Sequence, residues 1–427
     1  MKYLLISPLL LLPSFAQATS KIYTGFNYGA FWSVEANAKK KADFLDGFNL
    51  AKNLTTDIPF DSARLFTCRA AGTLNEPTEA FDAAVESKTN LLLGFWITPA
   101  QKGALPDENI RNEMAALEKG FKQHGQALSD LIIGLAVGSE DVYRAEEAGE
   151  LGVTADVVGQ AISQVKKGIA TSSFAQYMKN KPIGHVDTAK HAVVNKADFI
   201  GVTAYPYWHK DSIDTASTSF LGSLQDVEKR AGDRPIWIAE MGWPSADTEQ
   251  HGEAIAGVDE LQRFWTETGC AVFGKYTTFW YELLKDSTPD QKADWSLIDT
   301  ISRKPRINNL GCGAPKRHLP AAPPASSPLV PQPILSASNM STGFNMHFIA
   351  NTTSTPVSSN TQPDTRTAQS STSTAKSSTS YTTVFETTTV TPRPTPSPPP
   401  SLSSNTSLVT IIITRDVNNQ AHQAELT

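Results

Sequence analysis

The sequence predicts a closed (β/α)8 barrel that is followed by a long tail rich in Ser, Thr and Pro. Two observations predict the barrel: eight short apolar runs recur between residues 20 and 312, and helical patterns separate them. Strands that alternate with helices pair in parallel through right-handed crossovers. Eight such units within about 300 residues fit a closed barrel better than an open doubly wound sheet. A Gly-x-Gly-x-x-Gly turn would favour a dinucleotide-binding fold, and the turn after the first run does not contain one.

The strands and helices can be placed in order along the chain. We expect strands at residues 22–27, 63–66, 91–96, 131–137, 183–186, 199–204, 236–239 and 276–281. Two intervening segments show apolar residues three and four apart, which form one face of a helix. These residues are Ile110, Met114, Leu117 and Phe121 before the fourth strand, and Val158, Ile162, Val165 and Ile169 after it.

The first residues of the chain predict export. Lys2 precedes the apolar stretch Tyr3 to Phe15, and Ala16-Gln17-Ala18 has the small-x-small pattern of a cleavage site. We therefore expect a secretory signal peptide over residues 1–18, removed after about Ala18. No later run reaches the ~18 apolar residues that a membrane-spanning helix requires. The folded domain is then expected over residues 19–312.

The chain changes character near Cys312. Residues 313–427 contain Ser/Thr/Pro tracts with few large apolar side chains, such as residues 370–380. Such a segment cannot bury enough surface to offset its ordering entropy, so we expect a disordered stalk that carries O-linked glycans. Asn-x-Ser/Thr sequons predict N-linked glycans at Asn339, Asn351 and Asn405 in the stalk and at Asn53 in the folded domain.

The charge of the chain argues against a protein that binds nucleic acid or anionic lipid. The cysteine content leaves the pairing of the thiols open. The net charge of −6 and the pI near 5.8 give no basic surface for nucleic acid or anionic lipid. Three cysteines permit one disulfide on an oxidising route, and we expect Cys270–Cys312 because both residues lie late in the folded domain. Three free buried thiols, Cys68 included, are the alternative.

The sequence gives no sign of a metal or cofactor site. There is no His-x-x-x-His pair, and His185, His191 and His209 are scattered. A Gly-x-Ser-x-Gly nucleophile turn and a phosphate-binding loop are also missing from the sequence. We expect no metal and no cofactor.

Two carboxylates stand where a barrel places its active site, at the carboxyl ends of strands. Glu240 follows the seventh apolar run, and Gly242 and Pro244 then turn the chain away, while Glu140 follows the fourth run. Strands four and seven face each other across a barrel mouth. A pair of carboxylates, one protonated and one ionised about 5 Å away, is typical of glycoside hydrolysis with retention. The alternative is that one or both are solvated acids at the rim.

Four motifs stand in order along the folded part of the chain. They are Gly25–Gly29 (GFNYG), Val137–Arg144 (VGSEDVYR), Pro182–Thr188 (PIGHVDT) and Glu240–Pro244 (EMGWP). With these motifs the chain resembles glycoside hydrolase family 17, the β-1,3-glucanases, and most closely its fungal cell-wall branch. The resemblance covers about residues 20 to 312.

The resemblance implies a role for each candidate residue. Glu240 would be the nucleophile and Glu140 the proton donor and general base. Arg64 would keep the nucleophile ionised, because a nearby guanidinium lowers the pKa of a carboxyl group. A surface cation is the alternative for Arg64, and core packing is the alternative for the aromatic candidates. The remaining sugar contacts would come from Tyr28, Tyr205, Trp243 and the third carboxylate Glu282, while Trp208 and Trp280 could be sugar platforms, wall or core.

The chain departs from the family pattern at three places. Ser139 stands where the family usually has Asn before the acid, so a hydrogen bond to a sugar hydroxyl would change. Met241 stands where Thr or Ser usually follows the nucleophile, and residues 282–286 lack the more acidic pattern of the branch. None of these departures removes a catalytic carboxylate.

The resulting expectation is a retaining endo-β-1,3-glucanase, a monomer that acts on cell-wall glucan. Glucan transglycosylation is one alternative, and a non-catalytic glucan-binding wall mannoprotein is another. We expect secretion to the cell wall and its matrix. A lipid-anchor signal is not expected, because the apolar run Leu408 to Thr414 is shorter than the ~10–20 residues such a signal needs.

Overall fold

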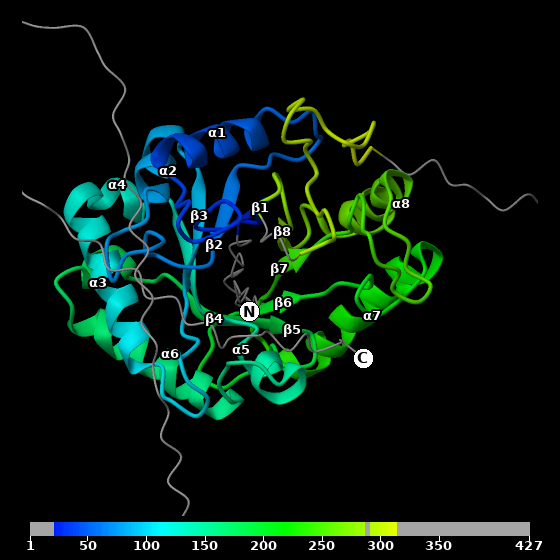
Figure 1. Ribbon diagram of the computed structural model, residues 1–427. Helices are drawn as coiled ribbons and strands as arrows, with labels where there is room; N and C mark the ends of the chain where they lie inside the picture. The colour runs from blue at the N-terminus through cyan, green and yellow to red at the C-terminus, as the bar shows by residue number, and fades with distance from the viewer. Residues whose placement is uncertain (1–20, 287–290, 314–427) are drawn as a thin grey trace, which may run out of the picture. The chain divides into compact units, whose positions relative to one another are not determined.

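The computed structural model describes residues 21–286 and 291–313 of the 427-residue chain. In this part, eight parallel strands pair in sequence order and close when β1 pairs with β8 (Figure 1). The strands are β1 (Thr24–Tyr28), β2 (Ser62–Leu65), β3 (Asn90–Phe95), β4 (Ile132–Ser139), β5 (Ile183–Thr188), β6 (Ile200–Thr203), β7 (Ile236–Met241) and β8 (Thr277–Trp280). The predicted (β/α)8 barrel is therefore confirmed, and every expected strand overlaps an observed one.

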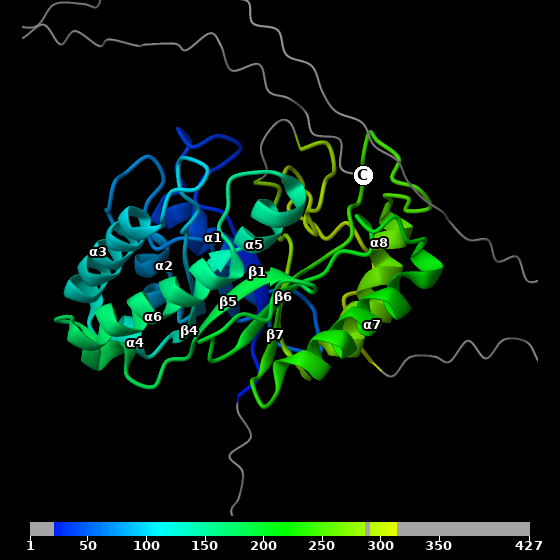
Figure 2. The ribbon, with the colours of Figure 1, turned by 90° about the horizontal axis from the view of Figure 1, so that it is seen from below.

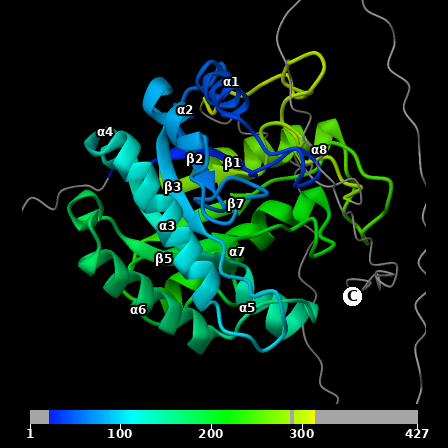
Figure 3. The same ribbon diagram turned by 60° about the vertical axis from the view of Figure 1, so that its left-hand side comes forward.

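Helices surround the strands (Figure 1). In Figure 3, helices α1 to α4 and α6 follow one another around the outside of the barrel. The two predicted helical faces lie on α3 and α6, and their apolar residues pack against the strands. The helices are α1 (Lys41–Lys52), α2 (Ala80–Ser87), α3 (Asp107–His124), α4 (Gln126–Ser129), α5 (Asp141–Tyr143), α6 (Ala155–Thr171), α7 (Ile213–Ala231), α8 (Val258–Phe264) and α9 (Cys270–Val272).

Three shorter helical segments complete the described chain. They are the π-helical turns η1 (Arg144–Ala148) and η3 (Trp265–Gly269) and the 3-10 turn η2 (Ala175–Met178). The sequence analysis did not predict them, because a single turn carries too little apolar periodicity to detect. Figure 2 shows that α5 lies close to the strand ends.

Two apolar layers hold the barrel together. Successive strand residues alternate between them, as β3 illustrates: Leu91 and Leu93 pack toward the helices, whereas Leu92 packs inside the barrel. Val186 and Phe279 belong to the same interior cluster. This alternation is the ordinary two-residue period of a strand.

The alternation is interrupted at three places, two on β4 and one on β7. Near the start of β4, Leu91 of β3 pairs with Ile132 but Leu92 pairs with Gly134. In β7, Val202 of β6 pairs with Ile238 but Thr203 pairs with Glu240, so β7 has one extra residue at this point. In β4, the pairing with β5 advances by three residues between Ala136 and Ser139 while β5 advances by two. An extra residue of this kind bends a strand and turns the following side chains.

The predicted disulfide is present, between Cys270 at the start of α9 and Cys312. Cys68 is a free, buried thiol. The expected signal peptide and the predicted glycosylation sites Asn339, Asn351 and Asn405 lie outside the described residues. No helix in residues 21–286 and 291–313 has the length and apolar character needed to cross a membrane.

Candidate active site

The two predicted catalytic carboxylates lie at the carboxyl ends of β4 and β7. Each follows an irregularity in the second half of its strand. Regular alternation would place Glu240 on the helix side with Ile238, but the extra residue in β7 directs it to the barrel mouth. Glu140 lies directly after β4 and has a left-handed backbone, with φ 57° and ψ 24°.

Glu240 accepts a hydrogen bond on each carboxylate oxygen. Arg64 Nη1 lies 2.5 Å from Oε1, and the Tyr205 hydroxyl lies 2.7 Å from Oε2. Burial and the Glu240 carboxylate raise the pKa of Tyr205 well above its usual value, so its phenol keeps the proton and donates it. Both oxygens thus face donors, which is the arrangement that suits an ionised carboxylate.

Arg64 is held by two further residues. Its Nη1 donates to Asn27 Oδ1 at 2.8 Å, and its Nη2 donates to Ser139 Oγ at 2.8 Å. The Arg64 side chain is only 1% exposed, which fixes the guanidinium inside the barrel mouth. Asn27 in turn donates to the carbonyl of Ala239 at 3.1 Å, next to Glu240. The alternative reading of Arg64 as a surface cation is therefore wrong.

Glu140 occupies a different environment. The Thr203 hydroxyl donates to its Oε1 at 2.6 Å. Burial and then the negative charge of Glu240 raise the pKa of Glu140 to about 7, although the Thr203 hydrogen bond acts in the opposite direction. Glu240 therefore has a donor on each oxygen, whereas Glu140 is protonated in mildly acidic solution.

A cleft of about 1360 Å³ opens beside Glu140. Thr203, Tyr205 and Trp208 line it near the strand ends, and it continues past Lys190 toward α7. Trp208 is 38% exposed and packs edge-on against the His251 ring at 4.8 Å. Such a partly exposed indole offers a flat apolar surface.

Two residues predicted to touch substrate, Tyr28 and Trp243, lie away from the barrel mouth. The Tyr28 side chain lies on the helix side of β1, where its hydroxyl donates to the Gly47 carbonyl of α1 at 3.2 Å. Trp243 is fully buried, and its Nε1 donates to the Ile255 carbonyl at 2.9 Å. The structure therefore does not bring Tyr28 or Trp243 to the site.

Glu282 lies after β8 and is 1% exposed. Burial and the neighbouring Asp286 carboxylate raise its pKa well above the usual value. Asp286 accepts a hydrogen bond from the Gly29 amide at 2.9 Å and forms an ion pair with Lys39. Glu282 is thus a buried acid beside an ion pair at the β1–β8 side of the rim.

No group of His, Cys, Asp and Glu suited to a metal ion occurs within residues 21–286 and 291–313. The described part of the site offers chemistry based on carboxylates, a guanidinium and hydroxyl groups.

Comparison with known proteins decides the family. The sequence model of the BtgE/BtgC glycoside hydrolase domain matches residues 24–295. The chain belongs to the BtgE/BtgC glycoside hydrolase family. This confirms the family resemblance drawn from the four motifs.

Curated fungal relatives support the assignment. The chain is 38% identical over 288 residues to a probable glucan endo-1,3-beta-glucosidase of Aspergillus niger, a match that covers 64% of this chain and 59% of the relative. A protein of the same name from Aspergillus fumigatus is 36% identical over 318 residues, with 70% and 68% covered. The chain therefore spans about three fifths to two thirds of the length of these curated relatives.

Solved structures support the fold. A glycoside hydrolase family 17 β-1,3-glucanosyltransferase from Rhizomucor miehei superposes with a TM-score of 0.54 at 21% identity and covers 67% of this chain and 97% of that one. An active-site mutant of a Rhizomucor miehei β-1,3-glucanosyltransferase in complex with laminaritriose gives a TM-score of 0.52 at 20% identity and covers 68% and 98%. At this identity the likeness establishes the shared barrel.

The two departures near the carboxylates now have a structural account. Ser139 binds Arg64 and so supports the guanidinium beside Glu240. Met241 is fully buried in the layer between strands and helices, on the opposite side of β7 from the mouth. The residue after Glu240 therefore does not enter the site.

Sequence reasoning missed Asn27 and Thr203, which contact Arg64 and Glu140. Both are polar residues at strand ends, which was a usable signal. In β1 the prediction chose Tyr28, but the two-residue period of a strand directs only one of two neighbours to the mouth. Asn27 is that neighbour.

Proposed function

We propose that this protein is a retaining glycoside hydrolase that cleaves internal β-1,3 linkages of cell-wall glucan. The observation that carries the proposal is the contrast between Glu240, whose two oxygens accept from Arg64 and Tyr205, and Glu140, whose pKa is raised to about 7. Two carboxyl groups held in different protonation states are what double displacement requires. The names of the curated fungal relatives support the choice of substrate.

The first step is formation of a glycosyl–enzyme intermediate. The Glu240 carboxylate attacks the anomeric carbon while the protonated Glu140 transfers its proton to the glycosidic oxygen, so the leaving glucan departs as an alcohol. Arg64 holds Glu240 in place and balances its charge before attack. Tyr205 donates to the other oxygen and also lines the cleft that opens beside Glu140.

The second step releases the sugar. Glu140, now ionised, takes a proton from water as the water oxygen attacks the anomeric carbon and the bond to Glu240 breaks. Two displacements at the same carbon return the original β configuration. If the hydroxyl of a second glucan replaces water, the same intermediate gives transglycosylation, and product lengths distinguish the two outcomes.

Signals in the sequence support a proposal for the location. We propose a secreted monomer that acts in the cell wall and is retained in the wall matrix by its substrate and by a glycosylated stalk. Residues 1–18 have the pattern of a signal peptide, and the tail is rich in Ser and Thr. The Cys270–Cys312 disulfide is compatible with an oxidising secretory route. Asn53, the sequon in the described domain, is exposed at the end of α1.

The test is reducing-sugar release from a linear β-1,3-glucan by the parent protein, Glu240→Gln and Glu140→Gln. We expect an active parent and two nearly inactive variants. Glu118→Gln on the outer face of α3, where Glu118 pairs with Lys122, is the matched control and should keep parent activity. Proton NMR of the first product should show the β anomer. A folded but inactive parent, or a fully active Glu240→Gln variant, would refute the proposal.

A further inference from the structure

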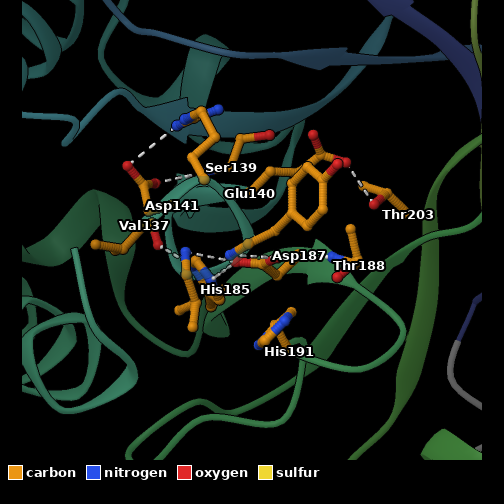
Figure 4. A network of polar contacts seen from close by, with 12 residues as sticks. Val137, Ser139, Glu140, Asp141, His185, Asp187, Thr188, His191 and Thr203 are labelled. Carbon is orange, nitrogen blue, oxygen red and sulfur yellow. Dashed lines mark hydrogen bonds and ion pairs between the residues drawn. The ribbon is translucent and has the colours of Figure 1, made fainter. Parts of the chain in front are cut away.

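A buried polar network lies beneath Glu140 and is not used in the chemical steps above (Figure 4). At its centre are His185 and Asp187 of β5, neither of which has an exposed side chain. His185 Nδ1 lies 2.7 Å from the Val137 carbonyl oxygen, and Nε2 lies 3.0 Å from Asp187 Oδ2. The ring therefore bridges β4, before Glu140, and the carboxylate at the end of β5.

The partners of the ring determine where its protons are. The Val137 carbonyl can only accept, so Nδ1 carries a proton. Asp187 also accepts hydrogen bonds from the backbone amides of Val142 at 2.9 Å and Thr188 at 2.8 Å. Amide donors on both oxygens of Asp187 favour the carboxylate form, and a carboxylate requires Nε2 to donate as well. Both ring nitrogens then carry protons, and the ring is charged.

We propose that His185 is a buried imidazolium that, through Asp187, positions Glu140 for its two proton transfers. The catalytic half of this inference rests on the function proposed above, whereas the charge state stands on the hydrogen bonds alone. His185 is a positioning residue and does not touch the reacting atoms.

The network controls the backbone on both sides of Glu140. The Glu140 amide donates to the Val186 carbonyl at 2.9 Å. Val186 stands between His185 and Asp187 in the sequence. Asp187 binds the Val142 amide two residues after Glu140. On the other side, Asp141 Oδ2 accepts from the Ser139 amide at 2.9 Å. These contacts hold the left-handed turn that directs the Glu140 carboxyl group toward the mouth.

The glycine before this turn is required by the same network. Gly138 has φ +85°, and a side-chain carbon there would lie 2.5 Å from Asp141 Oδ2 and 3.1 Å from the His185 ring. The turn therefore packs closely against both Asp141 and His185.

The imidazolium also sets the charge near Glu140. The groups that face Glu140 are Glu240 on β7, Asp187 on β5, Arg144 on η1, Tyr205 after β6 and Tyr143 on α5. The Asp187 charge raises the pKa of Glu140, and a positive His185 beside Asp187 offsets this effect. Losing the imidazolium would leave Asp187 uncompensated.

The environment of His185 favours the charged form. Burial lowers its pKa, but the hydrogen bond and charge of Asp187, with Asp141 and the Val137 carbonyl, outweigh burial and raise the pKa above its ordinary value. Asp141 is itself paired with Arg144 at 3.1 Å. The cluster of one imidazolium, one guanidinium and two carboxylates is thereby electrically balanced.

The direct test is nitrogen NMR of the full-length protein labelled at its eight histidines. We expect one ring to keep protons on both nitrogens at pH 7.5, where an ordinary histidine is neutral. Its signals should disappear in the His185→Gln variant, and Asp187→Asn should return the ring to the neutral form. If every histidine loses a proton below pH 7.5, the proposal is overturned. This readout needs no substrate, so an inactive protein with a charged His185 would refute the proposed function alone.

The second test is the pH profile of kcat on β-1,3-glucan. We expect His185→Gln to lower kcat about 10²-fold with KM little changed, and to move the alkaline limb to higher pH because Asp187 is uncompensated. In the double variant His185→Gln/Asp187→Asn, the Asp187 charge is also removed, so the alkaline limb should return toward that of the parent. His124→Gln, which removes a partly buried histidine that is paired with Asp82 on the helix layer, is the matched control. A folded His185→Gln variant with the parent's limb and kcat would overturn the positioning role.

Discussion

Arg64 Nη1 lies 2.5 Å from Oε1 of Glu240, although 176 positions separate the two residues in the chain. The contact exists because β2 and β7 both end at the same rim of the barrel. Arg64 reaches it across the barrel mouth, since its side chain is buried and points inward from β2. The pair therefore depends on barrel closure and on the extra residue that turns Glu240 inward.

Replacing Arg64 by Lys should separate charge from geometry. Lysine keeps the positive charge but cannot contact Glu240, Asn27 and Ser139 together, because its ammonium group is a single point. We expect kcat on β-1,3-glucan to fall by about 10²-fold or more. Arg263→Lys, at an exposed ion pair with Asp214, controls for the substitution itself. A folded Arg64→Lys variant within threefold of the parent would show that charge alone is sufficient.

Replacing Thr203 by Val should move the alkaline limb of the kcat/KM profile. The Thr203 hydroxyl donates to Glu140 and so lowers its pKa against the larger effect of burial. In the proposed mechanism Glu140 acts first as an acid, so we expect activity to fall as pH rises through its pKa of about 7. Without the hydroxyl, we expect the limb to shift to higher pH by roughly half a unit to one unit.

The control for this experiment is Thr278→Val on β8. Thr278 is also buried, but its hydroxyl donates to the Tyr276 carbonyl, at the opposite end of its strand from the rim. Its pH profile should match that of the parent. A limb that moves to lower pH in Thr203→Val would contradict the assigned hydrogen bond.

The barrel could be predicted from the sequence because it depends on short-range patterns. Apolar runs and helical faces repeat in the order that a parallel barrel needs, and the strand ends then locate Glu140 and Glu240. The direction in which a side chain points was harder to predict. Tyr28 and Asn27 are neighbours in one motif, and only the observed register shows that Asn27 faces Arg64.

The extra residues in β4 and β7 could not be predicted for a related reason. A β-bulge arises from the pairing of two strands that are distant in sequence. The residues of a run such as Ile236–Met241 show the same apolar pattern whether or not the strand contains a bulge. The His185–Asp187 pair was noted only as part of a motif. Its bridging role requires the position of the Val137 carbonyl, which lies 48 residues away.

Removing the ionisable group of Glu140 should stabilise the protein in a pH-dependent way. The pKa of Glu140 is raised from 4.5 to about 7 in the folded state, so the folded state prefers the protonated form. Stability from this group is present below pH 4.5 and is lost as pH rises toward 7. The new side chain in the Glu140→Gln variant cannot ionise, so the gain in unfolding free energy of this variant over the parent should be about 3 kcal/mol larger at pH 8 than at pH 4.

Thermal or urea unfolding at the two pH values measures this difference. Glu150 is exposed and lies shortly after Glu140 in the chain. Glu150→Gln therefore measures the effect of removing an exposed carboxylate on stability at the two pH values. If Glu140→Gln changed stability equally at pH 4 and pH 8, the raised pKa of Glu140 would be refuted.

The Cys270–Cys312 disulfide should contribute to stability without affecting catalysis. It closes a loop with a sequence separation of 42, for which the chain-entropy argument gives about 4 kcal/mol at 25 °C. The segment before Cys312 also has contacts of its own: Trp265 Nε1 donates to the Leu310 carbonyl at 3.2 Å, and Gln262 donates to Asn309 at 2.8 Å. The folded arrangement should therefore survive loss of the bond.

We expect Cys270→Ser/Cys312→Ser to lower the unfolding free energy by about 3 to 4 kcal/mol in urea while kcat stays within twofold. Reductant should lower the stability of the parent by a similar amount and leave the double variant unchanged. A thiol titration of the unreduced, denatured parent should find one free thiol, that of Cys68. Three free thiols would show that the bond does not form, and a large loss of kcat would show that the segment before Cys312 supports the active site.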